Sequence, residues 1–215
     1  MNKYFPGVYK LKNRPATINS SPRTQVYGEK IIKIKGKEFR MWDPFRSKLS
    51  AGILNGLRNF PFSEDSNVLY LGASSGTTAS HLADVCTQGI IYCVEISPRM
   101  MRELMYVCKK RKNMIPILAD ATQPTTYASM ISAVDVIYQD VAQPNQAELL
   151  LKNARLFKAK KAMIAIKARS IHTERSPKKV CKEEVQKLED HFKVTENIDI
   201  KPFDKDHVLV NLITK

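Results

Sequence analysis

Short apolar runs alternate with amphipathic stretches from residue 68 onward, and this alternation limits the possible folds more than any other feature of the chain. Runs this apolar are typical of parallel strands that are buried on both faces of a sheet. The expected strands are "NVLYLG", "GIIYCVEI", "MIPILAD", "VDVIYQD" and "AMIAIKA". Helical spacing predicts helices over residues 77–85, 98–110, 127–131, 145–157 and 177–192.

Two further strands are expected at the C-terminal end, in "FKVTENIDI" and "DHVLVNLIT", with no helix between them. Neighbouring strands joined without a helix pair antiparallel, so the sheet should close with an antiparallel pair. Seven strands of this kind predict an α/β fold with a doubly wound, Rossmann-like sheet that helices cover on both faces. Such sheets bind ligands at the carboxyl ends of their strands.

The first fifty residues differ from the rest, because proline and glycine break them into short β-rich pieces. The candidate strands lie in "GVYKLK", "VYGEKIIKIKG" and "KEFRMW", and Gly36 is placed for a hairpin turn. A helix begins near the end of this region, with Ser47 as its N-cap. We therefore expect a small N-terminal β-sheet module over residues 1–50 and the α/β domain over residues 51–215.

The chain is basic. Its 215 residues include 35 Lys and Arg against 21 Asp and Glu, a net charge of +14. The first fifty residues hold 12 basic and 3 acidic side chains, so most of the excess lies there. This charge predicts a polyanionic partner, with nucleic acid the leading candidate, although a basic surface that only favours solubility would give the same count.

Cysteine, histidine and hydropathy patterns argue against several classes of protein. The four cysteines form no CxxC pair and the four histidines are scattered, so we expect no zinc or other metal site and no disulfide framework. No apolar run approaches the roughly 18 residues of a membrane span. The N-terminal "MNKYFPGVYK" lacks the apolar core of a signal peptide. We therefore expect an intracellular protein with no membrane partner.

A turn bracketed by glycines follows the first buried run, in "LGASSGTTASH". Gly72 and Gly76 lie where the backbone of such folds approaches a nucleotide-like cofactor, and Thr77 and Thr78 add hydroxyl groups at the helix start. Ser74 replaces the second glycine of a dinucleotide fingerprint, which argues against close approach of a pyrophosphate. Alone, the motif is weak, because many α/β proteins turn here with glycine.

Three successive strands of the predicted sheet end in an acidic residue: Glu95, Asp120 and Asp140. A lone acid at a strand end is usually a helix cap or a loop residue, but three at one edge would be costly to bury without a ligand. Glu95 is placed to accept hydrogen bonds from ribose hydroxyls, and Asp120 suits an adenine amino group. Together with the glycine turn, these acids favour S-adenosylmethionine over NAD.

Two lysines and a histidine stand in unusual positions. Lys48 falls in the first turn of a predicted helix, where the helix dipole disfavours a cation, and Lys167 ends an apolar strand. His207 opens the last strand. Each alone has an ordinary interpretation as a surface residue or a side chain that reaches solvent. With Asp140, however, they could form a cluster that orients and deprotonates a hydroxyl group.

Several long segments resemble the fibrillarin family in wording and order. They are "VLYLGASSGTTASH", "VEISPR", "NMIPILADAT", "VDVIYQDVAQPNQAELLLKNA", "MIAIKARSI" and "DHVLV", and "KEFRMWDPFRSKLSAGI" extends the resemblance toward the N-terminus. The resemblance covers nearly the whole chain. It implies the seven-stranded fold of S-adenosylmethionine-dependent methyltransferases, and methyl transfer from that cofactor to ribose 2′-hydroxyls of rRNA and tRNA.

Fibrillarins act inside box C/D guide ribonucleoproteins, so the resemblance also implies partners. These are a guide RNA that selects the nucleotide, the target RNA, a Nop-domain scaffold protein and a kink-turn-binding protein of the ribosomal type. The chain is similar to the compact archaeal members, which lack the Gly/Arg-rich arm of the nucleolar eukaryotic members. We therefore expect a cytoplasmic location, and a nucleolar one only in a eukaryote.

The resemblance assigns residues to roles. The residues expected to hold the cofactor are Gly72, Thr77, Thr78, Glu95, Ile96, Asp120, Ala121, Asp140, Val141, Ala142 and Gln143. Ile96 stands where the family usually has an aromatic residue. The implied catalytic set is Lys48, Asp140, Lys167 and His207. We expect Asp140 to hold or receive the hydroxyl proton, directly or through Lys167.

Two other classes of function are possible on the same fold. One is a small-molecule methyltransferase or an NAD enzyme, against which the basic N-terminal part and the missing second glycine argue. The other is a non-catalytic RNA-binding subunit, which predicts the loss of cofactor or catalytic residues. All four catalytic positions are filled.

Overall fold

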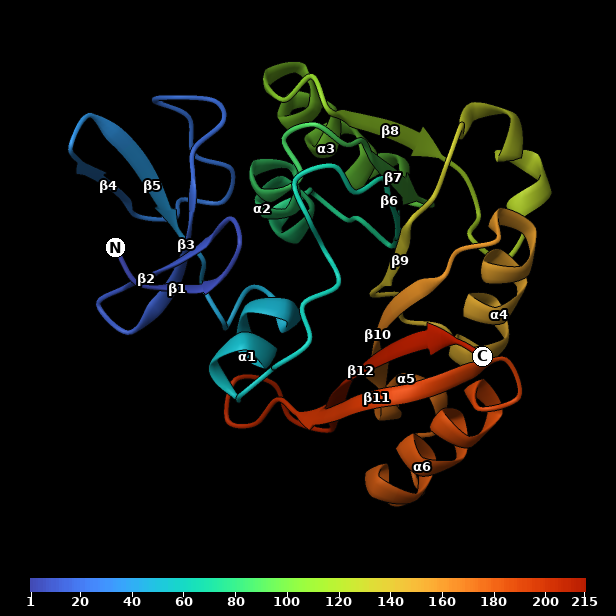
Figure 1. The fold of residues 1–215 in the computed structure, drawn as a ribbon. Coiled ribbons are helices and arrows are strands. Elements are labelled where there is room, and N and C mark those ends of the chain that lie inside the picture. Colours follow the sequence, from blue (N-terminus) through green and yellow to red (C-terminus); the bar gives the residue numbers. More distant parts are fainter.

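The computed structural model describes residues 1–215 and contains two β-sheets with helix α1 between them (Figure 1). The smaller sheet consists of β1 (Lys3–Phe5), β2 (Val8–Leu11), β3 (Arg14–Ile18), β4 (Ile31–Ile34) and β5 (Lys37–Met41). The larger sheet consists of β6 (Val68–Leu71), β7 (Ile91–Glu95), β8 (Met114–Leu118), β9 (Val136–Gln139), β10 (Lys161–Lys167), β11 (Phe192–Asp199) and β12 (His207–Thr214). The helices are α1 (Lys48–Leu54), α2 (Thr77–Val85), α3 (Pro98–Lys110), α4 (Gln146–Phe157), α5 (Ala168–Ile171) and α6 (Pro177–Leu188).

The larger sheet has the strand order β11-β12-β10-β9-β6-β7-β8. Its five strands from β10 to β8 run parallel, while β12 is antiparallel to both β10 and β11. The predicted seven-stranded sheet with an antiparallel closing pair is therefore confirmed. The order reverses between β6 and β9, and crevices for ligands form at the carboxyl ends of the strands beside such a reversal.

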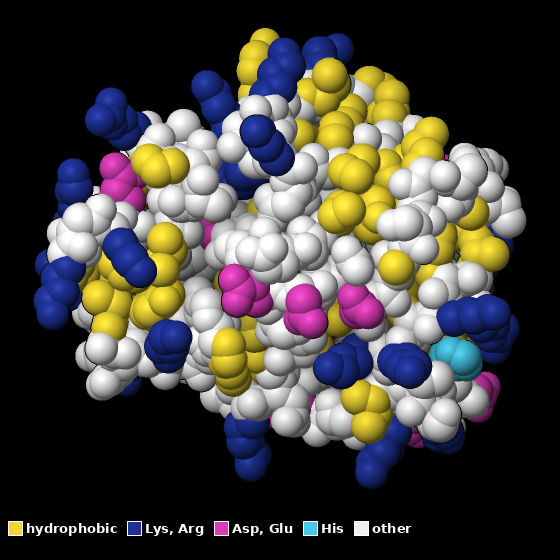
Figure 2. Space-filling model, turned by 45° about the horizontal axis from the view of Figure 1, so that its top comes forward, with side chains coloured by type: hydrophobic (Ala, Val, Ile, Leu, Met, Phe, Trp, Pro, Cys, Tyr) yellow, Lys and Arg dark blue, Asp and Glu magenta, His cyan; other side chains and the backbone are white.

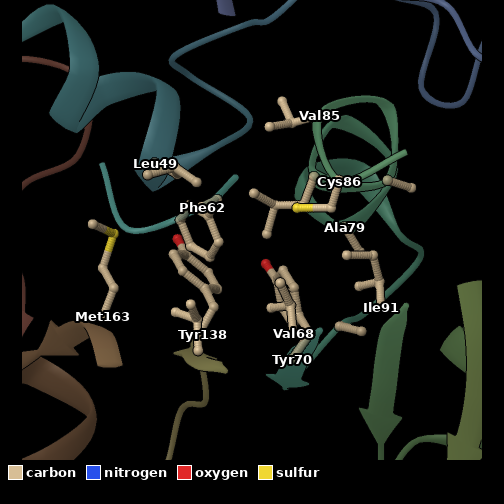
Figure 3. Close-up of a cluster of buried hydrophobic side chains, with 14 of the residues drawn as sticks. Leu49, Phe62, Val68, Tyr70, Ala79, Val85, Cys86, Ile91, Tyr138 and Met163 are labelled. Carbon is tan, nitrogen blue, oxygen red and sulfur yellow. The ribbon is translucent and has the colours of Figure 1, made fainter. Parts of the chain in front are cut away.

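Helices cover both faces of the larger sheet, because both faces of its parallel strands are apolar. Leu49 of α1, Leu82 of α2 and Leu104 of α3 pack into one buried cluster. Figure 3 shows part of this cluster, in which Leu49 and Phe62 lie above Tyr138, and Tyr70 stands beside Tyr138 with the two ring centroids 4.8 Å apart. The opposite face is covered by α4 and α6, which contribute a second cluster of apolar side chains.

The smaller sheet is antiparallel, with the strand order β1-β2-β3-β5-β4. Its predicted hairpin is confirmed: Lys35 and Gly36 both have positive φ between β4 and β5, as a two-residue hairpin turn requires. The predicted N-cap is also confirmed, because the Ser47 hydroxyl accepts a hydrogen bond from the Ser50 amide. The predicted division at residue 50 falls inside α1, and both sheets contribute to the cluster around Leu49.

Two predicted helices are wrong in detail. Residues 127–131 do not form an α-helix; two short 3₁₀ turns, Pro124–Thr126 and Ala128–Met130, stand there. Tyr127 between them is fully buried and its hydroxyl donates to Asn153, so tertiary contacts fix the backbone here. The last helix ends at Leu188 instead of residue 192, because Phe192 begins β11 and is buried in the second cluster.

A buried ionic network joins the smaller sheet to α2. Arg40 on β5 lies 2.6 Å from a Glu29 oxygen and 2.7 Å from an Asp84 oxygen, and none of the three side chains is exposed. His81 completes this junction: its two ring nitrogens lie 2.8 Å from the hydroxyls of Thr17 and Tyr27. Buried charges are costly unless paired, so this network holds α2 in one position against the smaller sheet.

The surface carries its charge unevenly. On the face seen in Figure 2, Lys and Arg side chains lie around the margin and beside a row of acidic side chains below the centre, and hydrophobic side chains gather in the upper right. The excess of basic residues therefore does not form one continuous patch on this face.

No helix has the length and apolar composition needed to cross a membrane.

Candidate active site

A cavity of about 270 Å³ lies at the carboxyl edge of the parallel strands, beside the reversal in strand order. Its walls come from the segments that follow β6, β7, β8 and β9, together with one residue each from α4 and β10. The lining residues are Gly72, Ser74, Val94, Glu95, Ile96, Ala119, Asp120, Ala121, Asp140, Val141, Ala142, Gln143, Leu149 and Lys167. The cavity therefore brings together nine of the eleven predicted cofactor residues.

Gly72 allows the segments after β6 and β9 to approach each other. Its φ is +81°, and a Cβ atom at this position would lie 2.9 Å from the carbonyl oxygen of Asp140 and 3.0 Å from a methyl carbon of Val141. Real Cβ atoms do not come this close to a backbone oxygen. Glycine is therefore needed both for the backbone conformation and for the space.

The acids at the carboxyl ends of β7 and β8 are held by backbone amides. The Glu95 oxygens accept hydrogen bonds from the amides of Ser74 and Ser97, each at 2.8 Å. One oxygen of Asp120 accepts from the Thr122 amide at 2.9 Å. A carboxylate oxygen can accept more than one hydrogen bond, so both acids keep capacity for donors on a ligand. This arrangement suits a nucleoside, with its ribose hydroxyls and its amino group.

The two predicted threonines lie at the start of α2, outside the lining of the cavity. Thr78 is buried, and its hydroxyl donates to the Ser47 hydroxyl at 2.9 Å. This bond connects the N-terminal ends of α2 and α1. Thr77 is the first residue of α2, and its role in cofactor binding stays a prediction.

Three of the four predicted catalytic residues meet at Asp140. Lys167 Nζ lies 2.8 Å from Asp140 Oδ1, and Lys48 Nζ lies 3.2 Å from the same oxygen. Both Oδ1 contacts are charge pairs with poor hydrogen-bond alignment, while Lys167 Nζ donates a hydrogen bond to the Asp140 carbonyl at 2.9 Å. The three charged side chains are each between 14% and 19% exposed, so they face a shielded but open position.

His207 reaches this group only indirectly. It is the register partner of Lys167 across β12 and β10, but its ring Nδ1 lies 2.9 Å from a carboxylate oxygen of Asp204 and 2.5 Å from the Lys205 carbonyl oxygen. The other oxygen of Asp204 lies 3.8 Å from Lys48 Nζ. The expected direct cluster of four is therefore a chain of five: His207, Asp204, Lys48, Asp140 and Lys167. Asp204 was not predicted.

A larger hollow of about 780 Å³ lies between α6 and the β11–β12 pair and reaches His207. It contains none of Glu95, Asp120 and Asp140. Because those acids and both lysines converge on the smaller cavity or its edge, we assign the chemistry to the smaller one.

The fibrillarin family model matches residues 1–215. The chain belongs to the fibrillarin family. A fibrillarin-like rRNA/tRNA 2′-O-methyltransferase of Methanothermobacter thermautotrophicus is 52% identical over 211 residues, which are 97% of this chain and 94% of that protein. The resemblance seen in the sequence is thus confirmed.

Solved structures of fibrillarins superpose closely on the chain. The Aeropyrum pernix fibrillarin in complex with natively bound S-adenosyl-L-methionine has a TM-score of 0.87 at 42% identity, covering 96% of this chain and 93% of that one. A chain from a fibrillarin/Nop5p complex has a TM-score of 0.92 at 39% identity, with 100% of both chains covered. The fold is the predicted one of S-adenosylmethionine-dependent methyltransferases.

In this fibrillarin, a buried pair of glutamines fixes the segment that carries Asp140. The Gln139 side-chain amide donates to the Gln146 carbonyl at 2.7 Å, and the Gln146 side-chain amide donates to the Gln143 carbonyl at 2.9 Å. The Gln146 side-chain oxygen accepts from the Lys167 amide at 2.9 Å. One side chain thereby connects the loop after β9 to the end of β10, and so holds Asp140 and Lys167 in register. Sequence reasoning missed both glutamines.

The tyrosines beneath the site stay protonated. Burial, and then the negative charge of Asp140, raises the pKa of Tyr70 well above its ordinary value. Burial, and then Tyr70 and Asp140, does the same to the pKa of Tyr138. Neither hydroxyl can act as a base near neutral pH, which leaves Asp140 and the lysines as the charged groups at the position where a substrate would enter.

Proposed function

We propose that the chain transfers a methyl group from S-adenosylmethionine to the ribose 2′-hydroxyl of a nucleotide in rRNA or tRNA. The observation that carries the proposal is the carboxylate of Asp140, paired with two lysines at the edge of a cavity suited to a nucleoside. Two relationships support the assignment: the chain belongs to the fibrillarin family, and a relative that is 52% identical is a 2′-O-methyltransferase.

The cofactor would occupy the cavity after β6, β7, β8 and β9. Glu95 would accept hydrogen bonds from its ribose hydroxyls and Asp120 from its adenine amino group, while the loop from Asp140 to Gln143 would cover its other side. Ile96 lines the cavity with 55% of its surface exposed, so it offers an apolar contact where an aromatic ring would stack. When bound, S-adenosylmethionine supplies an electrophilic methyl group.

The residues of the chain supply position and charge. Asp140 accepts the hydrogen bond of the attacking hydroxyl and takes up its proton, because the hydroxyl alone is too weak an acid to ionise at neutral pH. Lys48 and Lys167 stabilise the negative charge that develops on the oxygen. His207 and Asp204 hold Lys48 in place. Correct alignment of the ribose supplies much of the rate.

The target would be chosen by a guide RNA in a box C/D ribonucleoprotein. A Nop-domain scaffold protein is the expected protein partner, since a relative with a TM-score of 0.92 crystallised with Nop5p. A kink-turn-binding protein would complete the assembly. Selection of the target by a guide fits the chain, because its basic charge gives affinity for RNA without distinguishing nucleotide sequences. We further propose a cytoplasmic location.

The test is reconstitution with guide RNA, target RNA, the two partner proteins and methyl-labelled cofactor. The proposal predicts a label on one ribose 2′-oxygen, at the nucleotide that the guide selects. A label on a base, or on no RNA while calorimetry shows bound cofactor, would refute it. Calorimetric titration with NAD in parallel tests the alternative of an NAD enzyme, which should bind NAD tightly.

A further inference from the structure

An exposed pair of aromatic rings stands at the rim of the candidate active site. Phe45 has 64% of its surface exposed, although it is a large apolar side chain. The ring of Phe203 meets it edge to face, with centroids 5.2 Å apart and planes at 73°. Phe203 itself is half-buried and packs against the cluster around Leu49.

Hydrogen bonds hold the backbone that carries both rings. The Phe45 amide donates to a side-chain oxygen of Asp43 at 2.9 Å, and the Asp43 amide donates to the hydroxyl of Tyr27 at 3.2 Å. The turn between β11 and β12 carries Phe203, whose amide donates to the Ile200 carbonyl at 3.0 Å. Figure 1 shows this turn beside α1. Because the backbone that carries each ring is already ordered, little backbone entropy is lost when the ring binds a ligand.

The pair adjoins the charged groups of the site. Phe45 precedes Lys48 by three residues, and Phe203 precedes Asp204 directly. Asp204 pairs with both Lys48 and His207. Neither aromatic residue lines the cofactor cavity. The rings therefore adjoin Lys48 and the acid that pairs with it, and they are not needed to enclose the cofactor.

Exposed cations surround the pair. Arg46, Lys201 and Lys205 are exposed, and each is within two residues of one of the two rings along the chain, as are the acids Asp43 and Asp204. Exposed aromatic rings among cations are the combination that binds single-stranded RNA, in which bases stack on the rings and phosphates meet the cations. Stacking of this kind does not read the sequence, which is compatible with selection of the target by a guide.

We propose that Phe45, supported by the edge contact from Phe203, stacks against a nucleobase of the target RNA at the methylated nucleotide or next to it. This inference rests on the proposed function and names a further contact with the same substrate. A segment of a protein partner would be the other possible occupant of these rings, and the three exposed cations favour RNA over it.

The experiment uses the reconstituted guide complex with 5-iodouridine placed in turn at the target nucleotide and at each neighbour. Light should cross-link one of these positions to Phe45, as mapped by mass spectrometry. In parallel, the methylation rate is measured against target RNA concentration for Phe45→Ala, Phe45→Trp and a control, Tyr106→Ala. Tyr106 on α3 is 71% exposed and is remote in sequence from the site.

Phe45→Ala should raise the KM for target RNA by about 5- to 100-fold, the range expected for loss of one stacked base, and leave kcat within about threefold. Phe45→Trp and Tyr106→Ala should behave like the unaltered protein. An unchanged KM together with no cross-link to Phe45 overturns the inference. So does a loss of assembly with the partner proteins before RNA is added, which would assign the rings to a protein contact. If the unaltered complex transfers no methyl group, the proposed function fails, and the cross-link still decides whether the rings contact a base.

Discussion

Lys167 Nζ lies 2.8 Å from the Asp140 carboxylate and 2.9 Å from the carbonyl oxygen of the same residue. One ammonium group thus holds both the side chain and the backbone of the segment that follows β9. The contact joins the carboxyl ends of neighbouring parallel strands, where the sheet geometry brings them together. Positioning and charge stabilisation are therefore combined in a single residue.

Replacement of Lys167 by glutamine should slow methyl transfer about 10²- to 10³-fold, because the developing oxyanion loses a charged donor. The measurement is a single-turnover rate in the guide complex at saturating cofactor and RNA. Lys161→Gln, at the exposed other end of β10, is the matched control and should keep the normal rate. Equal rates for the two variants would remove Lys167 from the mechanism.

Asp204→Asn should slow the reaction by roughly tenfold, because the pairs with Lys48 and His207 each lose one charge and charge-assisted pairs are stronger than neutral ones. Asp206→Asn serves as the control, because Asp206 pairs only with the half-exposed Arg169. If the two variants have the same rate, the chain through Asp204 has no catalytic role.

Gly72→Ala should destabilise the fold by about 2 to 3 kcal/mol and weaken cofactor binding at least tenfold, because strain in φ and a collision with Asp140 act together. Gly56→Ala isolates the first effect: Gly56 also has a positive φ, of +93°, but nothing within 4 Å of the added carbon. Gly56→Ala should lower the free energy of unfolding by about 1 kcal/mol and leave the cofactor affinity normal. Urea unfolding and calorimetric titration measure the two quantities. Equal stability and affinity in both variants would contradict the assigned role of Gly72.

Acid should destabilise the protein through His81. Burial, and then the charges of Arg40 and Arg111, holds the pKa of His81 well below its usual value in the folded state. The unfolded chain takes up a proton near pH 6.5 and the folded chain does not, so the free energy of unfolding falls as the pH drops below that value. The slope from this residue approaches about 1.4 kcal/mol per pH unit.

His81→Gln should remove this part of the pH dependence between about pH 6.5 and 5, as measured by urea unfolding at several pH values. His172→Gln, at an exposed position after α5, is the control and should leave the slope unchanged. An undiminished slope in His81→Gln would show that the acid sensitivity arises elsewhere.

The periodicity of apolar residues predicted most of the architecture, and the acids at strand ends predicted the edge that carries the site. Both are local patterns in the sequence. β3 escaped prediction because it contains Pro15, which usually excludes a strand interior; here the strand tolerates the proline. The helix expected over 127–131 failed because buried contacts of Tyr127 override helical spacing. Such contacts join residues far apart in sequence and leave no local pattern.

The candidate site also contains residues whose contacts could not be predicted from local sequence. Lys48 and Lys167 stood out because each is a cation at a position that usually lacks one, and Asp140 stood out as one of three acids at one edge of the sheet. Asp204 lies in a turn between strands, where an acid is ordinary, and only the fold reveals its place between His207 and Lys48. Gln146 likewise appears as a common first-turn helix residue, although it connects the Asp140 loop to Lys167.

The role of Asp140 is tested by the single-turnover methylation rate of Asp140→Asn in the complete guide complex, with cofactor binding measured separately. The rate should fall about 10²- to 10⁴-fold, because the isosteric amide can neither take up the hydroxyl proton nor pair with both lysines. Cofactor affinity should stay within about tenfold of that of the unaltered protein, since Glu95 and Asp120 are untouched. A normal rate of 2′-O-methylation by Asp140→Asn would contradict the account.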